Sequence, residues 1–126
     1  MALKVLVAED NLINQRLVIA MLSTLGHTGV IVADGAKALK CLTQLQFDVV
    51  LMDVMMPTMD GLEALAKIRE QEGSSGRHLP VIMATAHAEP GDGEKFKQAG
   101  ADGYVSKPMD TAALERELLR VMAFKR

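Results

Sequence analysis

Cysteine, excess positive charge and long apolar runs are all missing or scarce in this sequence. Cys41 is the only cysteine, which excludes an intramolecular disulfide and a metal site built from several thiolates. The 14 basic residues are outnumbered by 16 acidic ones, so the chain offers no basic surface for nucleic acid. No run approaches the roughly 18 apolar residues of a membrane span, and the amino terminus lacks a secretory signal pattern. We therefore expect a cytoplasmic domain that contacts neither nucleic acid nor membrane, whether or not a parent protein is membrane-anchored.

The length and the composition favour one folded domain. A chain of 126 residues is long enough to bury a core without disulfides or a structural metal. Its 49% apolar and 24% charged residues are typical of a globular protein. We expect a single domain over residues 1–126, which could have been cut from a longer protein.

Short apolar runs alternate with segments of helical period along the chain. The runs are nearly continuous, as expected of parallel strands that are covered on both faces. They are Leu3–Ala8, Gly29–Ala33, Val49–Met52, Val81–Ala84 and Tyr104–Val105. Between them, apolar side chains recur every three or four residues, most weakly at Gly91–Ala99. Helix-capping side chains are expected at Asn11, Asp34, Asp60 and Asp110.

Five strands alternating with five helices predict a doubly wound α/β fold with a parallel sheet, because parallel strands need crossover connections. The sequence alone does not order the strands. With the order 2-1-3-4-5, the second strand lies on one side of the first strand and the later strands lie on the other side. The topological switch point would then be between the first and third strands. Ligands would then collect at the carboxyl ends of these strands.

Polar residues stand where four of the five predicted strands end. Glu9 and Asp10 follow the first strand, Asp53 the third, Thr85 the fourth, and Lys107 the fifth. Three carboxylates in one crevice repel one another, by roughly 3 kcal/mol for two charges about 5 Å apart at an effective dielectric near 20. A hard divalent cation such as Mg²⁺ would offset this repulsion, since it prefers oxygen ligands. A carboxylate beside Mg²⁺ and an ammonium group could then act as a nucleophile toward phosphorus.

Each of these residues also has an ordinary structural interpretation when it is taken alone. Acidic pairs often precede helices, aspartates often end strands in turns, and single threonines and lysines usually lie on the surface. The functional interpretation depends on their joint occurrence at four strand ends. The methionines Met55, Met56 and Met59 favour equally a partner-binding patch and an adaptable cover over the crevice.

Four segments resemble, in order and spacing, the receiver domain of response regulators in two-component signalling. They are Val5–Asn11, Asp48–Gly61, Thr85–Ala86 and Gly103–Pro108. The resemblance extends over the entire chain, and the combination of segments is far more specific than any one of them. It implies a flavodoxin-like three-layer sandwich with the strand order 2-1-3-4-5.

The resemblance also implies a metal site and a phosphoacceptor. Asp53 would accept the phosphoryl group. Asp10 and Asp53 would bind Mg²⁺ directly together with the backbone carbonyl of Met55, and Glu9 would bind it through water. Met55 and His87 occupy the positions that in this family flank the attacking water and tune the lifetime of the phosphoryl group.

A switch is implied on the same basis. Thr85 and Lys107 would contact the phosphoryl group, and the peptide bond between Lys107 and Pro108 would be cis. Phosphorylation would draw Thr85 inward and let Tyr104 turn from an outward to an inward rotamer, changing the surface of the fourth helix, fifth strand and fifth helix. Without the resemblance, Tyr104 would be expected to be half-buried packing on an end strand.

Partners follow from the same resemblance. The phosphodonor would be a histidine kinase or a histidine phosphotransfer domain, and a homodimer could form through the fourth helix, fifth strand and fifth helix. The runs Ala8–Asn14 and Leu51–Pro57 resemble receivers that are fused to hybrid sensor histidine kinases. No turnover is expected beyond phosphorylation and dephosphorylation of the domain itself.

Two other functions remain open at this point. A metal-dependent phosphohydrolase with an aspartyl nucleophile would need an acidic residue two positions after Asp53, where Met55 stands, and a cap for which the chain has too few residues. A degenerate receiver used only for binding is disfavoured by the full acidic set together with Thr85 and Lys107. The histidines offer neither a zinc site nor a phosphodonor helix.

Overall fold

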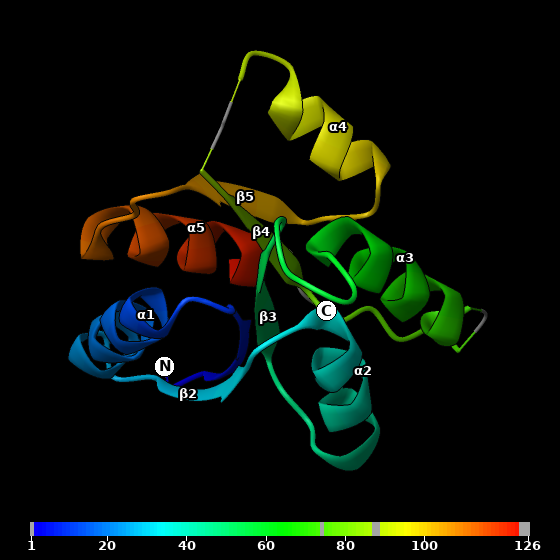
Figure 1. The fold of residues 1–126 in the computed structure, drawn as a ribbon, viewed down its shortest axis with the longest axis horizontal. Coiled ribbons are helices and arrows are strands. Elements are labelled where there is room, and N and C mark those ends of the chain that lie inside the picture. Colours follow the sequence, from blue (N-terminus) through cyan, green and yellow to red (C-terminus); the bar gives the residue numbers. More distant parts are fainter. Residues whose placement is uncertain (1, 74, 87–88, 124–126) are drawn as a thin grey trace.

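The computed structural model describes residues 2–73, 75–86 and 89–123, and within them strands and helices alternate five times (Figure 1). The strands are β1 (Lys4–Ala8), β2 (Thr28–Val32), β3 (Val49–Asp53), β4 (Val81–Thr85) and β5 (Gly103–Ser106). The helices are α1 (Leu12–Thr24), α2 (Gly35–Gln44), α3 (Gly61–Glu72), α4 (Asp92–Gln98) and α5 (Thr111–Ala123). Each of the predicted apolar runs coincides with a strand, with small shifts at the ends.

All five strands form one parallel sheet in the order β2-β1-β3-β4-β5. The predicted doubly wound, flavodoxin-like arrangement is therefore confirmed. Every residue of β3 and β4 is buried, which explains why their sequences are apolar rather than alternating. β2 lies on one side of β1, and β3, β4 and β5 lie on the other side, so the topological switch point is between β1 and β3. Ligands are therefore expected at the carboxyl ends of these two strands.

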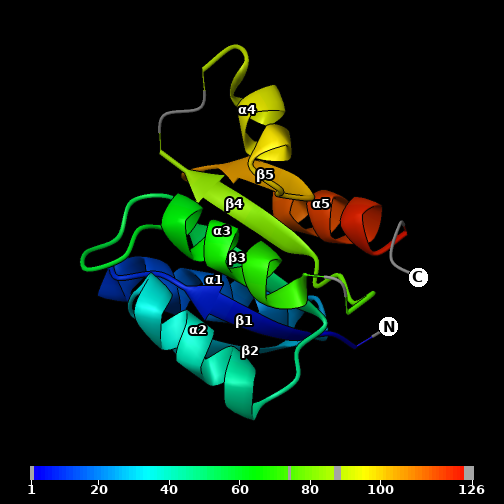
Figure 2. The ribbon, with the colours of Figure 1, turned by 90° about the vertical axis from the view of Figure 1, so that its right-hand side faces the viewer.

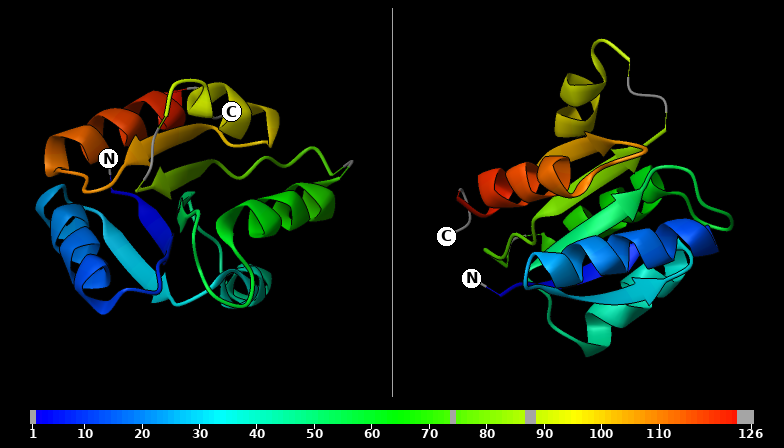
Figure 3. Two further views of the ribbon diagram at one scale, coloured as in Figure 1. Left: turned by 45° about the horizontal axis from the view of Figure 1, so that its top comes forward. Right: turned by 90° about the vertical axis from the view of Figure 1, so that its left-hand side faces the viewer.

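Helices cover both faces of the sheet. α1 and α5 lie on one face (Figure 3). Val18 and Leu22 of α1 belong to the same buried cluster as Leu114 of α5. α2 and α3 lie on the other face (Figure 2). Leu65 of α3 and Phe96 of α4 belong to a second buried cluster, in which α2 also takes part. Among the described residues, no helix is both long enough and apolar enough to cross a bilayer.

The predicted capping side chains fix the start of four helices. Each accepts a hydrogen bond from the backbone N–H three residues later, at 2.9 Å for Asn11, 2.8 Å for Asp34, 2.9 Å for Asp60 and 2.7 Å for Asp110. Gly26 lies two residues beyond the last residue of α1, Thr24, and its φ of 85° suits glycine. There the N–H groups of Gly26 and His27 donate to the carbonyls of Ser23 and Leu22, which closes a Schellman motif.

α4 is the helix with the least support. It is shorter than the predicted Gly91–Ala99 segment, it starts after Gly91 at a φ of 93°, and no side chain caps it. Phe96 is its only buried residue. Because α4 is short, has no side-chain cap and buries only Phe96, we expect it to be displaced more easily than the other helices.

Candidate functional site

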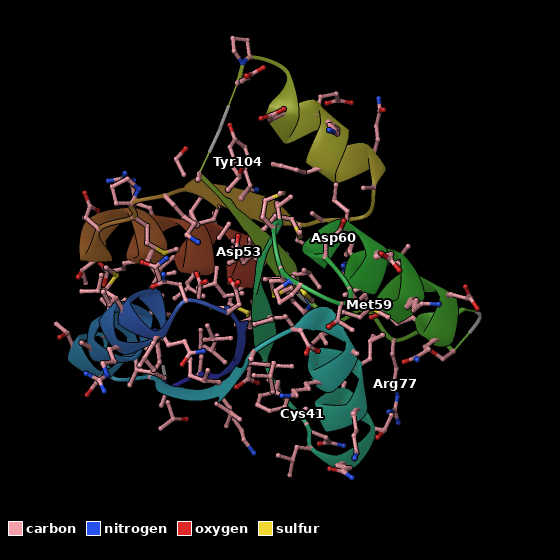
Figure 4. The ribbon with its side chains drawn as sticks, in the orientation of Figure 1. Cys41, Asp53, Met59, Asp60, Arg77 and Tyr104 are labelled. Carbon is pink, nitrogen blue, oxygen red and sulfur yellow. The ribbon has the colours of Figure 1, made fainter. Side chains whose placement is uncertain are left out.

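The acidic residues meet because β1 and β3 are paired neighbours. Ala8 pairs with Met52, so Glu9, which follows β1, lies beside Asp53, the last residue of β3, at the carboxyl edge of the sheet. Figure 4 labels Asp53 at this end of β3. Glu9, Asp10 and Asp53 each offer a carboxylate oxygen, and these oxygens all lie within 4.8 Å of one another. The structure thus brings together the three carboxylates that were expected to meet.

Lys107 offsets part of this negative charge. Its Nζ donates hydrogen bonds to Glu9 Oε1 at 2.8 Å and to Asp53 Oδ2 at 2.9 Å. Burial of the ammonium group is the largest influence on its pKa and acts to lower it. The hydrogen bonds and charges of Glu9 and Asp53 together outweigh burial and raise the pKa of Lys107 above its usual value. Lys107 is therefore cationic at neutral pH.

Glu9 is held in place by its neighbours as well as by Lys107. The side chain is buried, and its second oxygen, Oε2, accepts the N–H of Asn11 at 3.0 Å. Its backbone carbonyl accepts a hydrogen bond from Gln15 Nε2 at 2.7 Å, and its N–H donates to the carbonyl of Val32. The two hydrogen bonds to its oxygens fix the orientation of the Glu9 carboxylate, and the two backbone hydrogen bonds fix the chain on either side of it.

Asp53 is also buried, with one oxygen on Lys107 and the other, Oδ1, accepting the N–H of Met55 at 3.3 Å. Directly beyond it, Gly61 begins α3 and donates its N–H to the carbonyl of Val54 at 2.9 Å. A Cβ atom on Gly61 would collide with the backbone carbonyl of Asp53. Glycine at this position therefore allows α3 to start against the end of β3.

Thr85 ends β4 beside the cluster and is buried. Its carbonyl accepts the backbone N–H of Lys107 at 2.7 Å, which ties β4 to the loop that carries the lysine. The peptide bond between Lys107 and Pro108 is cis, as the resemblance implied. Thr85 follows Ala84, the strand partner of Asp53, and its contact with a phosphoryl group stays a prediction.

Tyr104 lies on β5 and faces α4 (Figure 4). Its side chain is 38% exposed, and its ring centroid is 5.8 Å from that of Phe96. A Cβ atom on Gly93 of α4 would lie 2.9 Å from Tyr104 Cε1, so the ring packs directly against the helix backbone. The tyrosine therefore contacts the least supported helix.

The Tyr104 backbone is also tied to α5. Its N–H donates to Glu117 Oε2 at 2.8 Å. Burial is the largest influence on the pKa of Glu117 and acts to raise it, but the hydrogen bonds from Arg120 and Tyr104 and the charge of Arg120 lower it overall. The free edge of β5 is thereby joined to α5.

The three methionines do not form one patch. Met55 is 72% exposed and its N–H contacts Asp53, whereas Met56 and Met59 are partly buried against the core. Met55 alone fits either of the two roles that were considered for the group. His87, the other residue expected beside the acceptor, lies outside the described residues.

The donor set fits a hard divalent cation. Three carboxylates supply only oxygen atoms, the ligand type that Mg²⁺ prefers, and Asp10 is exposed at the mouth of the cluster. Within the described part of the chain, no hydrogen bond or ion pair occupies the Asp10 carboxylate. Lys107 contributes one ammonium group against three carboxylates, an arrangement that a further cation would complement.

Sequence reasoning missed Gln15 as part of this site. Its amide reaches back from the first turn of α1 to Glu9, the residue that follows β1. The spacing between Glu9 and Gln15 was the available signal. When a helix follows a strand directly, a long side chain in its first turn can reach back to the end of the strand.

A doubly wound parallel sheet that gathers three carboxylates and a lysine at its topological switch defines a flavodoxin-like domain with an acidic cation site. A family model described as the response regulator receiver domain matches residues 5–119. The chain belongs to this family.

Relatives of known architecture include hybrid kinases. The chain is 45% identical over 116 residues to hybrid signal transduction histidine kinase I of Dictyostelium discoideum. The aligned region covers 88% of the chain but 7% of that protein. It is 38% identical over 120 residues to sensor protein GacS of Pseudomonas syringae pv. syringae, and this aligned region covers 94% of the chain and 13% of that protein. The chain therefore spans a small part of the length of these relatives, and it is homologous to receiver domains of hybrid sensor histidine kinases.

A solved structure supports both the fold and the cation site. The receiver domain of sensor histidine kinase PA1611 from Pseudomonas aeruginosa PAO1 matches with a TM-score of 0.84 and 38% identity, covering 98% of this chain and 99% of that one. That structure holds a magnesium ion in its active site cleft.

Proposed function

We propose that the domain accepts a phosphoryl group from a phosphohistidine onto Asp53. The observation that carries this proposal is the position of Asp53, which is buried at the switch point with one oxygen on Lys107 and with Glu9 and Asp10 beside it. A carboxylate oxygen of Asp53 would attack phosphorus. A P–O bond forms as the P–N bond to histidine breaks, and the bonding electron pair returns to the imidazole nitrogen.

Asp10 and Asp53 would hold Mg²⁺ directly, together with the backbone carbonyl of Met55, and Glu9 would act through a water molecule. Support comes from the 4.8 Å limit on the distances between the three carboxylate oxygens and from the exposure of Asp10. When bound, Mg²⁺ supplies positive charge between the carboxylates and the oxygens of the transferring group.

Lys107 and Thr85 would contact the phosphoryl group once it is on Asp53. Lys107 already lies 2.9 Å from Asp53 Oδ2, and its compact ammonium group with rotatable donors can shift to a phosphoryl oxygen. Thr85 would donate its hydroxyl to another oxygen. Because the Thr85 carbonyl accepts the Lys107 N–H, the two residues would move as a linked pair.

The output would be a changed surface made by α4, β5 and α5. Tyr104 is the proposed switch residue, and its contacts with Gly93 and Phe96 link it to the most weakly held helix. The same surface could pair two copies of the chain. The partner that supplies the phosphoryl group would be a histidine kinase or a histidine phosphotransfer domain, and a hybrid histidine kinase would be the parent protein.

Phosphorylation by acetyl phosphate with Mg²⁺ tests this function, with mass spectrometry as the readout. A receiver gains one acid-stable, base-labile phosphoryl group, which is lost in Asp53→Asn. Asp60→Asn is the matched control, because Asp60 caps α3 from an exposed position. Continuous turnover of the donor without a stable adduct would favour a phosphohydrolase instead, and no reaction would favour a degenerate receiver.

A further inference from the structure

Two side-chain hydrogen bonds hold the two peptide units that flank Asp10. The Glu9–Asp10 peptide is held at its oxygen, because the Glu9 carbonyl accepts Gln15 Nε2 at 2.7 Å. The Asp10–Asn11 peptide is held at its nitrogen, because the Asn11 N–H donates to Glu9 Oε2 at 3.0 Å. A peptide unit is planar, so fixing its oxygen or nitrogen also fixes the direction in which the Asp10 Cα leaves it.

The Asp10 side chain itself has no such support. It is exposed, and no partner orients its carboxylate within the part of the chain that the structure describes. Its place in the carboxylate cluster therefore depends on the backbone turn, and the turn depends on Gln15 and on the carboxylate of Glu9. Since the Glu9 carbonyl lies beyond the last residue of β1, the amide of Gln15 replaces the sheet as its partner.

We propose that Gln15 is a positioning residue for the cation site, which holds the turn that presents Asp10. This inference rests on the proposed function. Gln15 touches neither the cation nor the phosphoryl group in this role. It acts through the Glu9–Asp10 peptide, and it lowers the cost of ordering Asp10 when a cation binds.

The alternative is that Gln15 only anchors α1. That need is already met by other contacts, because Asn11 caps the helix and the backbone N–H of Gln15 donates to the Asn11 carbonyl at 2.9 Å. An anchoring role would affect unfolding but would leave the affinity for Mg²⁺ unchanged. The two roles therefore differ in a measurable quantity.

The experiment compares Gln15→Met with Gln71→Met in the purified chain. Methionine keeps the length and the helix propensity of glutamine but cannot donate a hydrogen bond. Gln71 is exposed on α3, so its replacement removes the same chemical group away from the site. Mg²⁺ binding is measured by isothermal titration calorimetry, and the Mg²⁺ concentration for half-maximal phosphorylation by acetyl phosphate is measured alongside.

Gln15→Met is expected to weaken Mg²⁺ binding by about three- to tenfold, which is the effect of losing one hydrogen bond. Gln71→Met is expected to bind Mg²⁺ with the same affinity as the unsubstituted chain. The rate at saturating Mg²⁺ should change much less than the Mg²⁺ requirement. Equal affinity in Gln15→Met and the unsubstituted chain overturns the inference. If circular dichroism shows that Gln15→Met does not fold, Gln15→Ala replaces it. If the unsubstituted chain itself binds no Mg²⁺, the proposed function fails and not only the role of Gln15.

Discussion

The ammonium group of Lys107 and the carboxylate of Glu9 lie 2.8 Å apart, although the two residues are 98 positions apart in the sequence. This contact joins the end of β1 to the loop after β5, across the full set of central strands. The same ammonium reaches Asp53 of β3. One cation from the loop after β5 therefore bridges two other segments, whose carboxylates would otherwise repel each other.

Lys107→Met should lower the free energy of unfolding at pH 7 by about 1–3 kcal/mol, because two buried carboxylates lose a charged hydrogen-bond donor. Since folding raises the pKa of Lys107, its contribution is fully present at pH 7 and is lost only as the pH rises above its ordinary value near 10.5. Saturating Mg²⁺ should restore part of the lost stability. Urea unfolding with and without Mg²⁺ measures both effects.

Lys67→Met is the control for this prediction, because Lys67 is exposed on α3 away from the cluster. Equal stability of the two variants without Mg²⁺ would mean that Lys107 does not offset the charge of Glu9 and Asp53.

The general fold and the members of the acidic cluster could be predicted from the sequence because local signals determine them. Continuous apolar runs indicate buried parallel strands, and Asn11 or Asp110 mark helix starts by their own side-chain chemistry. The strand order could not be derived in this way, since it depends on packing between helices that are far apart in the sequence. It followed from the resemblance to a known family.

Contacts between distant side chains were not predictable. Arg69 of α3 donates to the carbonyls of Gly100 and Leu79 and to the carboxylate of Asp102, yet no local pattern indicates that these residues meet. The same holds for Gln15, whose role depends on where the Glu9 carbonyl points. Such contacts appear only once the elements have been placed in space.

Gly61→Ala should lower the free energy of unfolding by about 1–3 kcal/mol, because the new methyl group collides with the Asp53 carbonyl. The better helix propensity of alanine, about 1 kcal/mol, offsets only part of this cost. The collision should also displace Asp53 and slow its phosphorylation by acetyl phosphate. Unfolding in urea and the rate of adduct formation are the two measurements, with Lys67→Ala on the same helix as the control. A Gly61→Ala chain as stable as the control would show that α3 can retreat from β3 without cost.

Glu117→Gln should reduce stability by about 1 kcal/mol at pH 7, because the charged hydrogen bonds with Arg120 are lost. Folding lowers the pKa of Glu117, so the carboxylate stabilises the fold above its ordinary pKa of 4.5 and loses this effect as the pH falls through the lower folded value. The difference in stability between Glu117→Gln and the unsubstituted chain should therefore shrink below pH 4.5.

Glu115→Gln changes an exposed residue of the same helix and should show no such pH dependence. A constant difference between Glu117→Gln and the unsubstituted chain down to low pH would contradict this account.

Gly93→Ala should displace Tyr104 from α4, because the added Cβ atom would lie 2.9 Å from the ring. Tyr104 is the only tyrosine and the chain has no tryptophan, so its fluorescence reports on one side chain. Quenching by acrylamide should therefore differ between Gly93→Ala and the unsubstituted chain.

If phosphorylation requires Tyr104 to leave its place against α4, the variant has already made part of that change. Its equilibrium level of phosphorylation should then rise, by about two- to fivefold for a shift of about 0.5–1 kcal/mol. Gln98→Ala, an exposed change in the same helix, should alter neither quantity. A displaced Tyr104 with an unchanged level of phosphorylation would separate the tyrosine from the switch, because linkage requires that two coupled equilibria shift together.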